Sequence, residues 1–194
     1  MNAAKTQAVE EEMQRSRPET WVHDPLFNIV LYEPEIPCNT GTIGRTCLGV
    51  GGKLWLVRPL GFQITDHQLK RAGLDYWPHL DWEAVDHWDH FLRRFSESLQ
   101  DLNKELKERQ EAQRDPRFWF FTKKAAHLYY NIEYHRGDVF VYGRESVGLA
   151  PEILEKYAEN TVRIPTLNTI RSLNQSVSVG ISIFEAKRQL EMKE

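Results

Sequence analysis

The sequence is poor in cysteine and has no long apolar run. Only two cysteines, Cys38 and Cys47, stand among its 194 residues, too few for the disulfide framework of a small secreted domain. No apolar stretch approaches the roughly 20 residues that cross a bilayer. No apolar region of a secretory signal follows residues 1–5. These absences predict a cytoplasmic protein that has no membrane partner.

Metal-ligand spacing and a surplus of basic residues are also missing. Neither cysteine lies in a Cys-x-x-Cys or Cys/His pattern, and His87 and His90 have no further ligands beside them, so we expect no metal. The net charge is -3, which is not typical of a nucleic-acid-binding protein. Composition therefore gives no support for RNA as a partner, and such support must come from motifs.

What the chain does have is the composition of one globular domain. Hydrophobic residues make up 41% and charged residues 27% of the sequence, enough to bury a core. Residues 1–25 are polar and charged, which predicts a flexible N-terminal arm. We expect residues 26–194 to form the folded domain.

Apolar runs and amphipathic segments alternate along this domain. We expect strands at residues 27–32, 53–57, 75–80, 118–122, 138–142 and 161–164, and helices at residues 40–49, 66–71, 145–157 and 172–193. Strands separated by helices predict an α/β fold with a mainly parallel sheet and helices on both faces. Ligands in such folds bind beyond the carboxyl ends of the strands.

The first unusual segment runs from Asn39 to Arg45 (Asn-Thr-Gly-Thr-Ile-Gly-Arg) and opens a predicted helix. Asn39 is a suitable N-cap, and the glycines let a ligand approach the backbone. First-turn N–H groups bind anions such as phosphate, and Arg45 offers a guanidinium fork for the same group. A capped helix with a surface arginine is the plainer interpretation, which spacing alone favours.

The second segment carries an apolar strand into Gly143, the charged pair Arg144 and Glu145, and a predicted helix that includes Gly148. It lacks the Lys-Ser/Thr of a P-loop and the spacing of a dinucleotide fingerprint. One interpretation is a tight turn with Glu145 in the first helical turn, where a carboxylate suits the helix dipole. The other is a backbone cradle for a small ligand, with Glu145 as an acceptor inside it.

The third segment contains Ile164 and Pro165, a polar loop, and then Arg171 to Ser176. Ser172 or Asn174 is suited to begin the last helix. Taken alone, the segment indicates nothing more than that helix start.

The order of these segments is more specific than any one of them. Asn-x-Gly-x-x-x-Arg at 39–45, Gly-x-Glu-x-x-Gly at 143–148, and Ile-Pro before Ser-x-Asn at 164–174 resemble the three motifs of the SpoU branch of SPOUT methyltransferases. Residues 28–37 and 70–76 (Lys-Arg-Ala-Gly-Leu-Asp-Tyr) are similar to the small bacterial family of tRNA cytidine/uridine wobble 2′-O-methyltransferases. The resemblance covers residues 27–192.

The resemblance implies methylation of the wobble ribose of a tRNA by S-adenosylmethionine, in a homodimer with its sites near the interface. It also implies a C-terminal deep trefoil knot, which periodicity alone does not indicate. The donor's adenine and ribose are expected at the backbone of Phe121, Gly143, Ile164 and Leu173, with Ser172 near its methionine end. The implied catalytic residues are Asn39, Arg45, Glu145, Ser172 and Asn174.

The chemistry agrees with these roles. The protein must align the donor with the ribose 2′-oxygen and help that hydroxyl to lose its proton. Arg45 is a poor base because guanidinium stays protonated. We expect it to hold the adjacent phosphate and stabilise the developing alkoxide, while a phosphate oxygen or a neighbouring side chain accepts the proton. From charge and position, we expect RNA contacts from Arg45, Lys70, Arg71, Arg144 and Arg171.

Two segments depart from that family: the arm and a long inserted helix at about residues 86–114. Apolar residues recur on one face of this helix, which packs on the domain, extends the dimer or contacts tRNA.

Competing functions are methylation of another tRNA position or of rRNA, and an inactive RNA-binding or assembly protein with the same fold. A nucleotide-binding oxidoreductase is disfavoured because Gly-x-Gly-x-x-Gly is missing.

Overall fold

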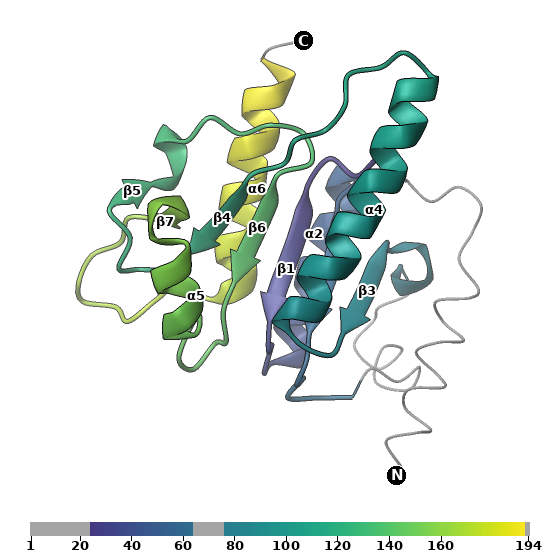
Figure 1. The fold of residues 1–194 in the computed structure, drawn as a ribbon. Helices are drawn as coiled ribbons and strands as arrows, with labels where there is room; N and C mark the ends of the chain where they lie inside the picture. The colour runs from purple at the N-terminus through teal and green to yellow at the C-terminus, as the bar shows by residue number, and fades with distance from the viewer. Residues whose placement is uncertain (1–23, 64–75, 193–194) are drawn as a thin grey trace.

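The computed structural model describes residues 24–63 and 76–192, and in this part of the chain seven parallel strands form one sheet (Figure 1). The strand order is β3-β2-β1-β6-β4-β7-β5. Most strands are short apolar runs, as expected for a parallel sheet that is covered on both faces. The strands are β1 (Asn28–Tyr32), β2 (Lys53–Val57), β3 (Trp82–Val85), β4 (Phe118–Phe121), β5 (His127–Leu128), β6 (Val139–Tyr142) and β7 (Thr161–Arg163).

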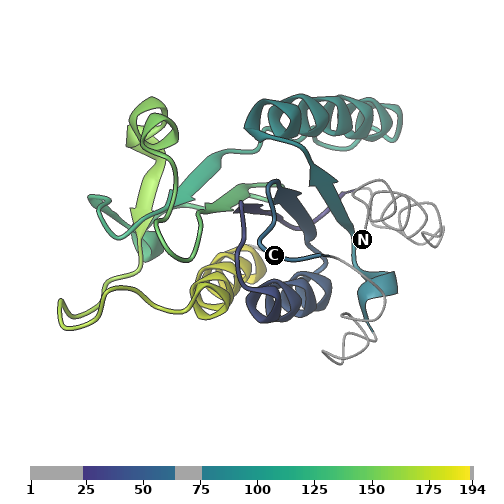
Figure 2. The same cartoon turned by 90° about the horizontal axis from the view of Figure 1, so that it is seen from below.

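Helices cover both faces of the sheet (Figure 2). Helices α2 (Pro37–Val50) and α6 (Gln175–Glu191) lie on one face, and α4 (Trp88–Glu108) and α5 (Pro151–Lys156) lie on the other. Alternate residues of β1 pack into the cores on the two faces of the sheet, because successive side chains of a strand point to opposite faces. Ile29 and Leu31 join the core under α2 and α6, whereas Val30 joins the core under α4. The expected α/β class and parallel sheet are confirmed.

Helix α4 packs its apolar face on the sheet. Phe91 and Phe95 approach Trp55 of β2 with ring centroids 5.3 Å and 6.3 Å apart. The helix ends at Glu108 rather than near Arg114. After it, Gln110 adopts a φ of 62° and the chain returns to β4 without regular secondary structure.

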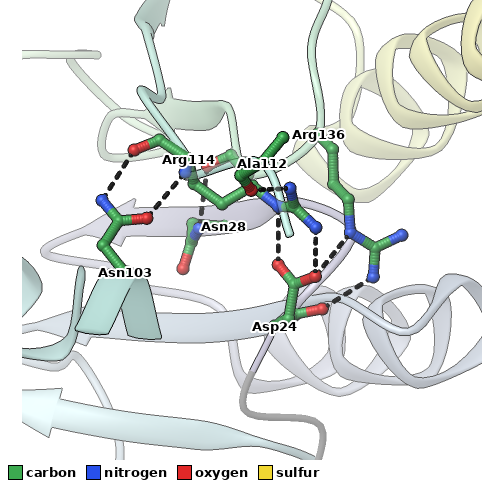
Figure 3. Close-up of polar contacts among 7 residues, drawn as sticks. Asp24, Asn28, Asn103, Ala112, Arg114 and Arg136 are labelled. Atoms are coloured by element: carbon green, nitrogen blue, oxygen red, sulfur yellow. Dashed lines mark hydrogen bonds and ion pairs between the residues drawn. The ribbon is translucent and has the colours of Figure 1, made fainter. Parts of the chain in front are cut away.

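A polar cluster ties this returning segment to the start of the described chain (Figure 3). The carboxylate of Asp24 accepts hydrogen bonds from Arg114 (2.7 and 3.1 Å) and Arg136 (2.9 Å). The side chain of Asn103 in α4 exchanges two hydrogen bonds with the backbone of Arg114. Partial burial raises the pKa of Asp24, but the two arginines outweigh it and hold that pKa below its usual value.

Two expected elements are wrong in the structure. The described part of the strand expected at 75–80, residues 76–80, is not a strand, because Trp77–His79 form a 3₁₀ turn around Pro78 and β3 lies at Trp82–Val85 instead. The helix expected from residue 145 begins only at Pro151, because residues 144–148 form a tight turn. Two further short 3₁₀ helices occupy Tyr129–Asn131 and Ala158–Asn160.

Some expectations lie outside the described residues: most of the N-terminal arm, the helix at residues 66–71, and both Lys70 and Arg71. Within residues 24–63 and 76–192, no helix is long and apolar enough to cross a membrane.

Candidate active site

A pocket of about 680 Å³ lies beyond the carboxyl ends of β4, β6 and β7. This is the edge at which ligands bind in parallel sheets. All five residues expected around the methyl donor line it, namely Phe121, Gly143, Ile164, Ser172 and Leu173. Asn39, Arg144, Glu145, Arg171 and Asn174 also line the pocket, whereas Arg45 does not.

The turn after β6 depends on Gly143. A Cβ at this position would lie 2.1 Å from both Gly148 C and Leu149 N, so only glycine permits the close approach. Backbone hydrogen bonds of 3.0 and 2.8 Å join Arg144 and Gly148, and Gly148 has a φ of +81°. Gln175 at the start of α6 donates to the carbonyl of Gly143 (2.7 Å). The turn is therefore fixed from both sides.

Glu145 points from this turn into the loop that precedes α2. Its carboxylate accepts hydrogen bonds from the backbone N–H groups of Glu35 (2.8 Å) and Ile36 (3.3 Å), and from Asn39 Nδ2 (3.1 Å). A helix-dipole role for Glu145 is therefore wrong, since no helix begins there. The donors to Glu145 belong to the protein itself, and its expected role as an acceptor for a bound ligand stays a prediction.

Asn39 connects Glu145 to the last helix. Its Oδ1 accepts from Asn174 Nδ2 (2.9 Å) while its Nδ2 donates to Glu145. The expected N-cap role of Asn39 is wrong, because Pro37 starts α2 and Ile36 occupies the cap position. Asn174 is the N-cap of α6, where its Oδ1 accepts from Ser176 N (2.8 Å). Side chains from all three motifs thus form one hydrogen-bonded chain.

A second carboxylate, that of Glu35, links the same two loops: it lies in the loop before α2 and accepts from the turn after β6. Glu35 accepts from the backbone N–H and hydroxyl of Ser146 (2.8 and 2.7 Å) and from Arg144 (3.3 Å), which also pairs with Glu33 (3.2 Å). The hydrogen bonds from Ser146 hold the pKa of Glu35 below its usual value. Sequence reasoning missed Glu35 and Ser146. The only signal for Glu35 was its place in the similar stretch at 28–37.

Basic side chains surround the pocket and hold the loop between β7 and α6. Lys123 donates to the carbonyl of Ile170 (2.5 Å), and Arg171 donates to the carbonyl of Ser146. The basic residues among those that line the pocket are Lys123, Lys124, Arg144, Arg163 and Arg171. The pocket rim is therefore locally positive although the chain as a whole is slightly acidic.

Arg45 lies beside the pocket rather than in it. It stands on an exposed face of α2, with its guanidinium carbon 4.7 Å from the centroid of the Tyr76 ring. This distance is that of a cation–π contact.

The pocket suits a ligand with an apolar ring and polar ends. Phe121, Val162, Ile164 and Leu173 supply apolar lining, and sites for cofactors are mostly apolar with a few placed polar groups. The buried Oε1 of Gln175 has no hydrogen-bond partner in the described part of the chain. Among the residues that the structure describes, no group of His, Cys, Asp and Glu side chains could hold a metal ion.

Comparisons with known proteins agree with the motifs. Residues 26–184 match the SpoU rRNA Methylase family. A tRNA (cytidine(34)-2′-O)-methyltransferase of Saccharophagus degradans is 38% identical over 169 residues, which cover 85% of this chain and 96% of that protein. A structure solved for the 2-OH methylation of C/U34 on tRNA is 36% identical, has a TM-score of 0.71, and covers 88% of this chain and 99% of its own.

More distant structures share the fold. An AdoMet-bound rRNA methyltransferase from Sinorhizobium meliloti is 22% identical with a TM-score of 0.64, covering 92% of this chain and 60% of its own. The motifs, the fold and the match over most of the chain agree, and the protein belongs to the SpoU methylase family.

Proposed function

We propose that the protein is a tRNA 2′-O-methyltransferase that uses S-adenosylmethionine to methylate the ribose of the wobble cytidine or uridine. One observation carries the proposal: a chain of hydrogen bonds joins Glu145, Asn39 and Asn174 beside the pocket. The near full-length similarity to relatives that are named for methylation at position 34 supports the choice of substrate.

The methyl donor fits the pocket after β4, β6 and β7. When bound, it supplies an activated sulfonium methyl group for transfer to the ribose 2′-oxygen. Phe121, Ile164 and Leu173 would enclose its adenine, and Gly143 and Ser172 would lie at its ribose and methionine ends. Lys123 and Arg171 hold the loop that carries Leu173 in place.

We assign Asn39, Glu145 and Asn174 to orienting the ribose hydroxyl that accepts the methyl group. Because Glu145 already accepts from two backbone N–H groups, we assign it to positioning Asn39 rather than to proton transfer. Asn39 is held in one amide orientation by Glu145 and Asn174. Such a fixed amide is suited to orient a ribose hydroxyl without reorganisation during the reaction.

The basic groups of the rim bind the RNA backbone. Arg144 and Arg171 line the pocket, and Arg45 stands beside it on α2. Phosphate contacts fix the orientation of a nucleic acid without reading its sequence. We assign Arg45 to the phosphate next to the target ribose, where its fork also stabilises negative charge on the reacting oxygen.

The knot, the dimer and the location are part of the same proposal. Gln189 of α6 exchanges hydrogen bonds with the backbone of Tyr134 and Ile132 (3.1 and 3.0 Å), so α6 packs against the loop between β4 and β6, and the resemblance to the family supports the knot. Val177 and Phe184 of α6 are 48% and 56% exposed, which supports burial of this face against a second copy. A tRNA substrate also implies action in the cytoplasm.

Methyl transfer from labelled S-adenosylmethionine to bulk tRNA tests the proposal, with nuclease digestion and mass analysis of the product. We expect a 2′-O-methylated pyrimidine at the first anticodon position. Label at another tRNA position, or in rRNA alone, would replace this substrate by one of the alternatives. Donor binding without transfer to any RNA would support the inactive RNA-binding alternative.

A further inference from the structure

The loop before α2 and the turn after β6 are joined by hydrogen bonds that run in opposite directions. The backbone N–H of Glu35 donates to the carboxylate of Glu145 (2.8 Å), and the backbone N–H of Ser146 donates to the carboxylate of Glu35 (2.8 Å). The other oxygen of Glu35 accepts from the Ser146 hydroxyl (2.7 Å) and from Arg144 (3.3 Å). Because Glu145 and Ser146 are neighbours in the chain, these bonds fix both the position and the direction of the turn.

Glu35 is the rigid side of this connection. The backbone N–H of Gly61 donates to the carbonyl of Pro34 (2.9 Å). A Cβ on Gly61 would lie 2.8 Å from both the Cα and the carbonyl oxygen of Glu35, so the segment after β2 packs directly against the backbone of Glu35. The carboxylate of Glu35 therefore extends from a fixed point.

The tip of the turn after β6 is the side that needs support. Ser146 is exposed and Val147 is 72% exposed, so apolar packing contributes little there. Two groups from outside the turn hold Ser146, namely the carboxylate of Glu35 and the guanidinium of Arg171, which donates to the Ser146 carbonyl. The base of the turn is held separately, because Gln175 donates to the carbonyl of Gly143 (2.7 Å). Loss of the Glu35 carboxylate should release the tip and leave the pocket wall at Gly143 in place.

The position of the tip matters because Glu145 lies next to Ser146 in it. Glu145 accepts from Asn39 Nδ2 (3.1 Å), and this bond requires the carboxylate to approach Asn39 from one direction. A displacement of about 1 Å in a group that orients a substrate costs up to about 100-fold in rate.

We propose that Glu35 is a positioning residue: it holds Ser146 and thereby keeps Glu145 where it orients Asn39. The inference rests on the proposed function, since it assigns a role to Glu35 in the same reaction. It predicts that the length of the Glu35 side chain matters more than its charge.

Three variants of Glu35 separate length from charge in steady-state methylation of tRNA. Glu35→Gln keeps the length: its oxygen still accepts from Ser146 N, and its NH₂ group donates to the Ser146 hydroxyl, which also accepts hydrogen bonds. Glu35→Asp keeps the charge but is one methylene shorter, and Glu35→Ala has neither. We expect kcat to fall about tenfold in the aspartate and alanine variants and to stay within about threefold of wild type in the glutamine variant.

Two further readouts distinguish positioning from a general loss of structure. The affinity for S-adenosylmethionine and the thermal midpoint should be unchanged in all three variants, because Gln175 still holds the base of the turn. Glu155→Ala, on the exposed side of α5, is the matched control and should leave kcat unchanged.

A double-mutant cycle with Glu145→Gln decides whether Glu35 acts through Glu145. We expect Glu35→Ala to lower kcat by less than about threefold once Glu145 is replaced. A full additional loss in that background, a wild-type kcat in Glu35→Ala, or an active aspartate variant beside an inactive glutamine variant would overturn the inference and leave the proposed function intact. A wild-type protein that methylates no tRNA would overturn the proposed function instead.

Discussion

Replacing Glu145 by glutamine tests whether the hydrogen bonds that Glu145 accepts from Glu35, Ile36 and Asn39 support catalysis. The carboxylate uses one oxygen for Glu35 N and the other for Ile36 N and Asn39 Nδ2. Glutamine keeps a single acceptor oxygen and places an NH₂ group against at least one of these donors. Leaving a buried or part-buried donor unsatisfied costs about 1–3 kcal/mol.

If this cost appears in the transition state, kcat for tRNA methylation falls roughly 10- to 100-fold in Glu145→Gln. The affinity for S-adenosylmethionine should change less than about threefold, because the apolar walls of the pocket are untouched. Glu155→Gln, on the exposed side of α5, removes the same charge outside the site and should match wild type. A Glu145→Gln variant with wild-type kcat would refute the role of Glu145 in orienting Asn39.

Three further changes test other parts of the account. Gly143→Ala forces a Cβ into the backbone of Gly148 and should weaken S-adenosylmethionine binding at least tenfold, as measured by calorimetry. Gly49→Ala is the control, because Gly49 of α2 has open space around it. This variant should leave binding unchanged and raise the free energy of unfolding by up to about 0.5–1 kcal/mol. Phe91→Ala removes a ring that packs on Trp55 and Phe95 and should lower the free energy of unfolding by about 3–5 kcal/mol in urea titrations. Asp24→Asn should cost about 1–2 kcal/mol at pH 7. Because the pKa of Asp24 is lowered in the folded state, its contribution is present above the unfolded value of about 3.9 and is lost as pH falls through the folded value. The deficit of Asp24→Asn should therefore shrink below about pH 4, and a deficit independent of pH would contradict the ion-pair account.

The sequence predicted the layers of the fold because buried parallel strands are continuous apolar runs. The stretches at β1, β2, β4 and β6 have this pattern and form the middle of the sheet. The strand at residues 75–80 was wrong because Pro78 interrupts it and the pairing partner of β2 begins only at Trp82. Apolar content alone did not separate a packed 3₁₀ turn from a strand.

The site was predictable in outline because parallel strands bring their carboxyl ends to one edge. Two side-chain hydrogen bonds form there between distant parts of the sequence. One joins Asn39 to Glu145, which is 106 residues away, and the other joins Asn39 to Asn174, which is 135 residues away. The two hydrogen bonds that Ser146 donates to Glu35 were not predictable, since they depend on the φ of Gly148 and on the exact approach of two loops. The same holds for the Arg45–Tyr76 contact, which required the packing of a turn on α2.

The most direct test of the central claim uses one tRNA in two forms, which differ only in the sugar of the wobble nucleotide. With ribose at that position we expect transfer of one methyl group from labelled S-adenosylmethionine to the wobble 2′-oxygen. With 2′-deoxyribose the acceptor oxygen is absent, and we expect no transfer while the tRNA still binds. Equal labelling of both forms would place the methyl group elsewhere and contradict the account.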